Sequence, residues 1–397
     1  MPDLAILHQS PTDPGFVQNP YPFYERARAQ GPFFYWQDYG HIATGNAAAV
    51  NAIFRDRRFG REVPADRQSP IPDHLKPFYA VEAHSMLELE PPRHTRLRGL
   101  VLRAFTSRRI AALAPEITQL CHDLVDALPT GEFDLLQHFG QRLPVTVIAR
   151  LLGVPEEMGD DLLRWSNAMV GMYMAGRDRA REDRAVQATE DFVAFMRSYV
   201  EERRGTPRDD LISALIAAEQ AGEKLSTDEL ITTCILLLNA GHEATVHSIG
   251  NGVKTLLETA TPLAALGPNS IEAAVEETLR FDPPLHIFTR WAYEDIEVMG
   301  TLIPKGTELQ LLLAAANRDP GVWEDADTFR PGRPVKPNAS FGAGVHFCVG
   351  APLARMELQI ALPILFDRLP KLRLTEAPVY GDVYHFHGLT RLMVRAD

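Results

Sequence analysis

The stretch from Phe341 to Gly350 most narrowly restricts what this chain can fold into. It reads Phe-Gly-Ala-Gly-Val-His-Phe-Cys-Val-Gly, and the pattern after it predicts a helix over residues 351–367. Glycines allow the backbone to approach a flat ligand closely and to adopt angles that other residues resist. The free N–H groups and positive dipole end of the following helix favour a thiolate over a thiol at Cys348. The stretch therefore predicts a loop that presents a thiolate.

A thiolate held in this way is a suitable axial ligand for haem iron, because it pushes electron density onto the metal and favours O–O cleavage. The alternative is a buried structural cysteine beside a glycine-rich turn, since a free cysteine is commonly a small buried hydrophobe. The stretch resembles, at every fixed position, the haem-binding loop Phe-Gly-x-Gly-x-His-x-Cys-x-Gly of the cytochrome P-450 (haem-thiolate monooxygenase) family. This resemblance extends with gaps from about Pro20 to the C-terminus, and it favours the ligand over the structural cysteine.

The resemblance implies a mainly α-helical fold with a small β lobe, the cytochrome P-450 fold. Haem b is then expected between the long helix over residues 226–258 and the Cys348 loop. We expect β-rich portions at about residues 33–60, 285–315 and 370–397, with helices in the remainder. No linker, repeat or low-complexity tract divides the 397 residues, so one haem-thiolate monooxygenase domain over residues 1–397 is expected. The proline-rich segment 60–85 reads as an irregular loop.

The helix expected over residues 226–258 begins at Ser226-Thr227-Asp228-Glu229, which has capping-box spacing. Its middle reads Asn-Ala-Gly-His-Glu-Ala-Thr over residues 239–245. A glycine and an acid inside an apolar helix cost stability, and such local conflicts are typical of functional sites. The segment resembles the family's distal helix, where Ala-Gly lets the helix open. The resemblance gives Glu243 a role in proton delivery.

One position in this helix departs from the family pattern. Ala244 stands where the family usually has threonine, and Thr245 lies one residue further, about 100° round the helix. Three proton donors therefore stay open, namely Thr245, a water held by Glu243, or a hydroxyl of the substrate. We hypothesise a water chain on Glu243, assisted by Thr245 or by the substrate.

Several basic residues are candidates for holding the haem propionates. His94 and Arg98 are four residues apart and share one face of a predicted helix. An arginine fork fits a carboxylate bidentately. The resemblance adds Arg290 and His346 as propionate partners. The full set of expected cofactor-binding residues is His94, Arg98, Arg290, His346, Phe341, Gly342, Cys348 and Gly350, with Cys348 as the metal ligand.

Glu277 and Arg280 are three residues apart on another predicted helix. An isolated pair at this spacing says little, since most such pairs are on the surface. At this distance before Cys348, however, the pair resembles the family's Glu-x-x-Arg motif, a buried structural pair. The resemblance places Thr328 at the position of a third arginine, and leaves Arg330 or Arg333 as its substitute.

An apolar substrate pocket is suggested by aromatic, aliphatic and methionine side chains from several segments. The expected pocket residues are Phe78, Met86, Met172, Leu238, Ile287, Phe288 and Phe386. Three histidines near them, His286, His385 and His387, either add polar contacts to this pocket or are surface histidines.

Composition excludes some classes of protein. A net charge of −12 argues against nucleic acid as the main partner, and no apolar run approaches the length of a membrane span. The N-terminal residues lack the pattern of a signal peptide. Cys121, Cys234 and Cys348 are too widely spaced for a disulfide framework. A soluble cytoplasmic protein is therefore expected.

The expected reaction inserts one atom of O2 into a small, mainly apolar organic substrate. No flavin, nicotinamide or iron–sulfur motif is recognisable, so the electrons are expected from a ferredoxin-type donor and its reductase. Candidates for a basic docking face are Arg103, Arg108, Arg109 and Arg355, which equally fit scattered solubilising charge. Two alternatives stay open: a peroxide-driven haem enzyme, which Ala244 would suit, and a non-catalytic haem protein that binds a gas or carries electrons.

Overall fold

The chain divides into two compact units. The computed structural model describes residues 4–220 and 225–397. The first unit comprises residues 1–68, 121–140 and 247–397, and the second comprises residues 69–120 and 141–246. Helices α7 (Ala114–Asp126) and α12 (Thr227–Glu258) run through the boundary. The single domain expected over residues 1–397 stays a prediction.

A mixed sheet of six strands forms the centre of the first unit. In order across the sheet, the strands are β1 (Ile6–Leu7), β2 (Phe34–Trp36), β3 (His41–Thr44), β9 (Glu308–Leu312), β6 (Ile287–Ala292) and β4 (Phe59–Gly60). Strand β3 pairs parallel with β9, and β6 pairs antiparallel with β9. Aromatic and β-branched residues in β6 suit a pleated surface, and β9 is buried from Leu309 to Leu312.

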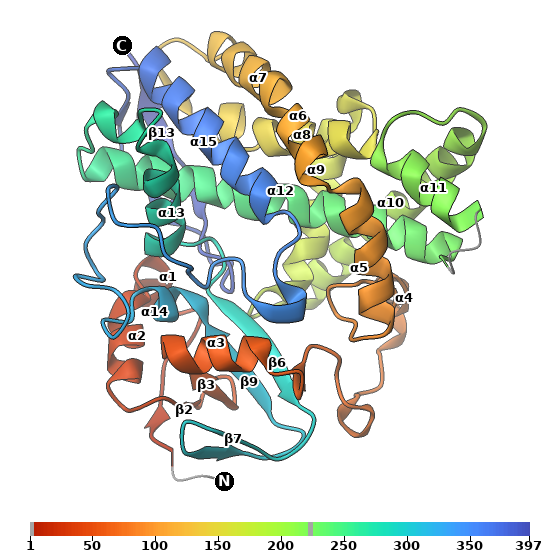
Figure 1. Cartoon of the computed structure of the whole chain (residues 1–397), viewed down its shortest axis with the longest axis vertical. Helices are drawn as coiled ribbons and strands as arrows, with labels where there is room; N and C mark the ends of the chain where they lie inside the picture. Colours follow the sequence, from red (N-terminus) through yellow and green to blue (C-terminus); the bar gives the residue numbers. More distant parts are fainter. Residues whose placement is uncertain (1–3, 221–224) are drawn as a thin grey trace. The chain divides into compact units, whose positions relative to one another are not determined.

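The two faces of this sheet carry separate apolar clusters because successive residues of a strand point to opposite faces. On one face, Phe288 packs with Leu311 and with Phe54 of α3 (Ala47–Arg55). On the other face, Ile287 packs with Leu312 and with residues of α2 (Tyr21–Arg28). Figure 1 shows α3 lying along β3, β9 and β6.

Smaller sheets and further helices complete the first unit. The small sheets contain β7 (Ile296–Val298) with β8 (Thr301–Ile303), β10 (Arg373–Leu374) with β13 (Met393–Arg395) and β5 (Glu132–Asp134), and β11 (Val379–Tyr380) with β12 (Leu389–Arg391). The other helices are α1 (Pro14–Gln18), α13 (Ile271–Phe281), α14 (Leu313–Asn317) and α15 (Ala351–Arg368).

The second unit is helical in the part of it that the structure describes. Its helices are α4 (Lys76–Glu82), α5 (Arg93–Ala104), α6 (Ser107–Ala112), α8 (Arg142–Leu152), α9 (Gly159–Val170), α10 (Arg179–Gly205) and α11 (Leu211–Gln220), followed by the first part of α12. No helix among residues 4–220 and 225–397 combines the length and apolar character needed to cross a membrane.

Two local expectations from the sequence were wrong. Segment 60–85 contains α4 as well as irregular chain, because Pro77 lies in the first turn of that helix, where a missing N–H costs nothing. Strand β5 interrupts a stretch expected to be helical. Gly131 turns the chain with φ of 83° just before β5, which then pairs antiparallel with β13.

The capping box at the start of α12 is confirmed. The Ser226 Oγ accepts the Glu229 N–H at 3.2 Å, and a Glu229 carboxylate oxygen accepts the Ser226 N–H at 3.0 Å. Arg96 of α5 also donates to Glu229, at 3.1 Å from Nη1 to Oε2. Burial raises the pKa of Glu229, but the hydrogen bonds from Arg96 and Ser226 outweigh it and leave that pKa below its usual value. The same carboxylate therefore caps α12 and holds α5 against its first turn.

Glu277 of α13 lies at the centre of a buried charged group. Arg280 donates to it through two hydrogen bonds, Nε to Oε2 at 2.7 Å and Nη2 to Oε1 at 2.8 Å, and both side chains are 1% exposed. Arg333 donates from Nε to Oε2 at 3.0 Å, whereas Arg330 donates only its backbone N–H, at 2.8 Å. Of the two substitutes left open by the sequence, Arg333 supplies the third charge.

Replacing Arg333 with methionine should destabilise the protein, because it removes a hydrogen bond from a buried carboxylate. Hydrogen bonds to charged groups contribute about 1.5–3 kcal/mol to the free energy of unfolding. Arg330→Met is the matched control, since that guanidinium is half exposed and pairs with Asp325 at 2.8 Å; surface ion pairs contribute at most about 1 kcal/mol. Urea unfolding of the haem-loaded variants would measure both changes. Equal midpoints would contradict the assignment of Arg333.

Candidate active site

The loop that contains Cys348 is a tight turn leading into α15. Gly342 and Gly344 have φ of 65° and 70°, a region that favours glycine. The Cys348 N–H donates to the Phe341 carbonyl at 3.0 Å, which closes the loop. Gly350 is the residue before the first turn of α15, and no side chain caps this helix. Cys348 thus lies just outside the positive end of an eighteen-residue helix, as the sequence predicted.

Cys348 differs from the other two cysteines in its exposure. Cys121 and Cys234 are buried, whereas Cys348 is exposed. Burial raises the pKa of both Cys121 and Cys234 to about 12, so neither thiol ionises readily. The alternative of a buried structural cysteine at this loop is therefore wrong, and the donor chemistry at Cys348 fits a metal-bound thiolate.

Phe54, at the end of α3, connects the loop to strand β6. A β-carbon on Gly344 would overlap the Phe54 carbonyl oxygen, and a β-carbon on Gly342 would lie 3.4 Å from the Phe288 ring. The Phe54 and Phe288 rings meet edge to face with centroids 6.2 Å apart. The Arg290 guanidinium lies 5.0 Å from the Phe54 ring centroid. The loop, α3 and β6 therefore pack as one group, which places Arg290 beside the loop.

A side chain of α15 contacts the loop at Phe341. Arg355 places its guanidinium 4.5 Å from the Phe341 ring centroid and donates from Nη2 to Glu276 at 3.2 Å. His346 ends a single 3-10 turn (Gly344–His346) and is half-buried. Arg355, which the sequence offered as a docking residue, thus braces Phe341 and pairs with an acid.

The other predicted haem residues belong to the second unit. His94 and Arg98 lie four residues apart on α5, with His94 3% exposed and Arg98 half-buried. Glu243 and Ala244 of α12 are half-buried, and Thr245 is buried. The structure thus groups Phe341, Gly342, His346, Cys348, Gly350 and Arg290 in the first unit, and His94, Arg98, Glu243, Ala244 and Thr245 in the second.

Helix α12 does not open at Gly241, contrary to expectation. It runs as one α-helix from Thr227 to Glu258, through the segment 239–245. A β-carbon on Gly241 would lie 2.7 Å from the Cγ1 of Ile148 in α8. The glycine is therefore needed for the close approach of two helices.

His242 gives Glu243 a buried, protonatable neighbour. The Nδ1 of His242 lies 3.0 Å from the Leu238 carbonyl, so it must carry the proton that this bond needs. The Nε2 lies 3.4 Å from both the Glu243 carboxylate and the Asn167 Oδ1. Glu243, His242 and Asn167 thus form a contiguous polar row in the second unit.

The expected substrate-pocket residues are divided between the units. Phe78, Met86, Met172 and Leu238 are buried in the second unit. In the first unit, Ile287 and Phe288 point to opposite faces of β6, and of these two only Phe288 faces the cluster beside the Cys348 loop. Phe386 forms an isolated bridge with Leu285. These pocket assignments stay predictions.

Gly344→Ala should disrupt the loop, because the added methyl group would overlap the Phe54 carbonyl. The matched control is Gly300→Ala in the β7–β8 turn, where φ is 77° and nothing lies within 4 Å of the added carbon. Both changes carry the cost of a left-handed alanine, roughly 1–2 kcal/mol. Only Gly344→Ala should lose the thiolate-type spectrum of the reduced, carbon monoxide-bound protein. A normal spectrum in that variant would show that the close contact is dispensable.

Known proteins that resemble this chain are cytochromes P450. The family model for cytochrome P450 matches residues 270–370, which include Glu277, Arg280 and Cys348. The cytochrome P450 monooxygenase PikC of Streptomyces venezuelae is 38% identical over 99% of this chain and 94% of its own length. The biotin biosynthesis cytochrome P450 of Bacillus subtilis strain 168 is 35% identical over 96% of each chain.

Solved structures that resemble this chain are also cytochromes P450. The crystal structure of P450BioI in complex with an acyl carrier protein ligated to hexadec-9Z-enoic acid matches with a TM-score of 0.91 and 34% identity, over 96% of this chain and all of that one. The epothilone D-bound cytochrome P450epoK matches with a TM-score of 0.91 and 30% identity, over 98% and 99% of the two chains. The expected mainly α fold with a small β lobe is confirmed, and with it haem b as the cofactor. This chain belongs to the cytochrome P450 family and is a haem-dependent monooxygenase.

Proposed function

We propose that Cys348 would hold the haem iron through its sulfur and that the residues of its loop would support the bound haem. The observation that carries this proposal is the exposed thiol at the start of α15, in a chain whose other two thiols are buried. When bound, haem b activates O2, so that one oxygen atom enters the substrate and the other leaves as water. Gly342 and Gly344 keep the loop flat, and Phe54, Phe288 and Arg355 hold it in place.

Four basic side chains are proposed to hold the haem propionates, namely His94, Arg98, Arg290 and His346. A guanidinium fits a carboxylate bidentately and offsets the charge that burial would otherwise disfavour. The position of Arg290 beside the Cys348 loop supports its part in this assignment.

Glu243 is proposed to deliver protons, with water and with Thr245 or the substrate as its partner. Ala244 has no hydroxyl group, so the residue that usually serves in the family is replaced here. The row from Asn167 through His242 to Glu243 supports this role, because its neighbouring atoms lie 3.4 Å apart.

The substrate is proposed to be a small, mainly apolar organic molecule, and the electrons to come from a ferredoxin-type donor and its reductase. Among the docking candidates, Arg103 and Arg108 are exposed, whereas Arg109 and Arg355 are half-buried. Arg103 and Arg108 are therefore the more accessible candidates for contact with an acidic partner. A cytoplasmic location stays a prediction.

Cys348→Ser should abolish the thiolate-type spectrum of the reduced, carbon monoxide-bound protein, because a serine hydroxyl does not supply thiolate electron density. Cys121→Ser and Cys234→Ser are the controls, since both thiols are buried with a pKa of about 12. These controls should keep the spectrum. An unchanged spectrum in Cys348→Ser would refute the assigned ligand.

Glu243→Gln should slow product formation by at least about 100-fold, since proton transfer by a positioned group contributes about 10²–10⁴-fold. Ala244→Thr should be tolerated and should raise the product formed per reductant consumed. The measurement is rate and coupling with one fixed substrate, supplied with redox partners or with peroxide. A wild-type rate and coupling in Glu243→Gln would remove Glu243 from the path. Turnover with peroxide but none with redox partners would favour the peroxide-driven alternative.

A further inference from the structure

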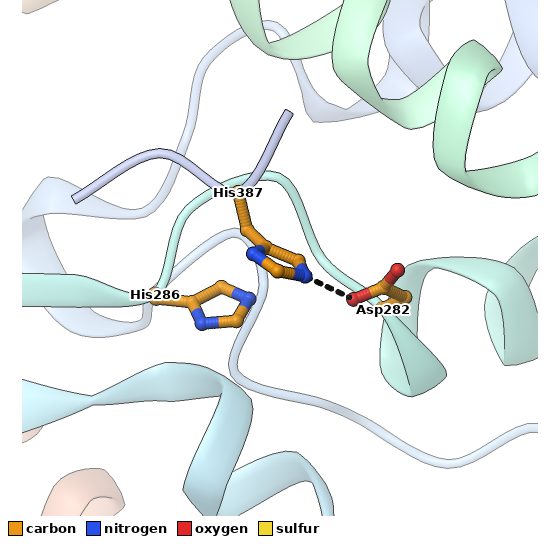
Figure 2. Close-up of side chains that lie close together, drawn as sticks. All are labelled: Asp282, His286 and His387. Atoms are coloured by element: carbon orange, nitrogen blue, oxygen red, sulfur yellow. Dashed lines mark ion pairs between the residues drawn. The ribbon is translucent and has the colours of Figure 1, made fainter. Parts of the chain in front are cut away.

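Three metal-ligating side chains meet in the first unit, outside the haem residues described above. Asp282 follows α13, His286 precedes β6, and His387 lies in the C-terminal turn between β11 and β12 (Figure 2). One donor atom from each residue lies within 4.8 Å of the others. Their exposures are 5%, 0% and 3%, so His286 and His387 are not the surface histidines that the sequence left open.

The donor atoms converge without bonding to one another. The Nδ1 of His286 lies 2.8 Å from the Tyr24 hydroxyl, and its Nε2 has no hydrogen-bond partner. Figure 2 shows a ring nitrogen of His286 on the side that faces His387 and Asp282. The Nε2 of His387 lies 3.6 Å from the Asp282 Oδ1, which is beyond hydrogen-bond length.

Surrounding tyrosines fix the orientation of these donors. The Tyr21 hydroxyl donates to the Asp282 Oδ1 at 2.8 Å, and the Tyr380 hydroxyl donates to Oδ2. The Tyr380 ring stacks on the His387 ring with centroids 3.6 Å apart. Hydroxyl and ring contacts of this kind orient metal ligands and tune their basicity. Tyr21 and Tyr380 therefore support the donor residues from outside the cluster.

Two cations lie near this cluster. Lys254 places its Nζ 5.4 Å from the Tyr380 ring centroid, and Arg318 lies against the ring of Tyr21. Its guanidinium lies 3.4 Å from the Tyr21 ring centroid and donates to the Phe281 carbonyl at 2.9 and 2.7 Å. It also pairs with Asp327 at 3.5 Å. No hydrogen bond or ion pair joins Arg318 to Asp282 among the described residues. Each Asp282 oxygen accepts one tyrosine hydroxyl, and a carboxylate oxygen has a second lone pair that can bind a metal.

We propose that Asp282, His286 and His387 bind a zinc ion. Two imidazole nitrogens and one carboxylate oxygen suit this metal, which binds them at about 2.0–2.2 Å with water in a fourth position. Tetrahedral donors at those lengths lie roughly 3.3–3.6 Å apart. The His387–Asp282 separation of 3.6 Å meets this range. The three donor atoms together lie within 4.8 Å of one another, so zinc would have to draw them closer.

A zinc ion at this position would connect three separate segments of the first unit. It would tie the C-terminal turn, which also contains Phe386, to the chain between α13 and β6. The backbone already links these segments, since the His387 N–H donates to the Pro284 carbonyl at 2.8 Å. The metal would add a bond to the His387 side chain and so hold this turn in place.

The test is zinc binding to the haem-loaded full chain after treatment with a chelator. The protein is dialysed to equilibrium against zinc chloride, and bound zinc is counted by atomic emission. Wild-type protein should bind one zinc ion more per chain than His387→Gln or Asp282→Asn. In both variants the affinity of the site for zinc should fall at least tenfold. His385→Gln is the matched control, because this histidine also has an unpartnered Nε2 but lies outside the cluster. The control should bind zinc as wild-type protein does.

Two outcomes would overturn the proposal. One is equal zinc binding by wild-type protein, His387→Gln and Asp282→Asn, with haem spectra showing that the variants fold. The other comes from zinc-edge X-ray absorption of wild-type protein, which needs no variant. A first coordination sphere with two imidazoles and a carboxylate supports the site, and one with only oxygen or with a thiolate overturns it.

Discussion

The close approach between the Phe54 carbonyl and Gly344 is the contact on which the Cys348 loop depends. No side chain fits at Gly344, and the backbone there takes a left-handed angle that other residues resist. The same Phe54 packs its ring against Phe288 and beneath Arg290. One residue of α3 thus fixes both the path of the loop and the strand that carries a propionate candidate. The position of the thiolate is therefore decided by a helix almost 300 residues earlier in the chain.

Features that depend on neighbouring residues could be predicted from the sequence. The capping box of α12 and the helix after Cys348 are local patterns, and both lie where they were expected. The general placement of the β-rich portions followed from the family resemblance. Helix α4 was missed because the prolines of its segment suggested irregular chain, although Pro77 is compatible with a first turn.

Features that depend on distant contacts could not be predicted in the same way. Arg330 and Arg333 are equally basic, and only the path of the irregular chain around them decides which guanidinium reaches Glu277. The burial of His286 and His387 depends on Tyr21, which contacts both rings although it lies far away in sequence. No local pattern distinguishes such histidines from surface ones. The role of Phe54 could not be predicted from the sequence either, because its contact with Gly344 is made by its backbone carbonyl.

The contact between Gly241 and Ile148 has a consequence for how this enzyme tolerates sequence change. Because a β-carbon at residue 241 would fall within 2.7 Å of the Ile148 side chain, the two positions share one small volume. A larger residue in α12 at this point requires a smaller one in α8, so the two positions should vary together. Recombination that takes α8 and α12 from different parents would separate such a pair. A clash there would push on the turn of α12 that also contains Glu243, and chimeras could lose activity without any change to a catalytic side chain.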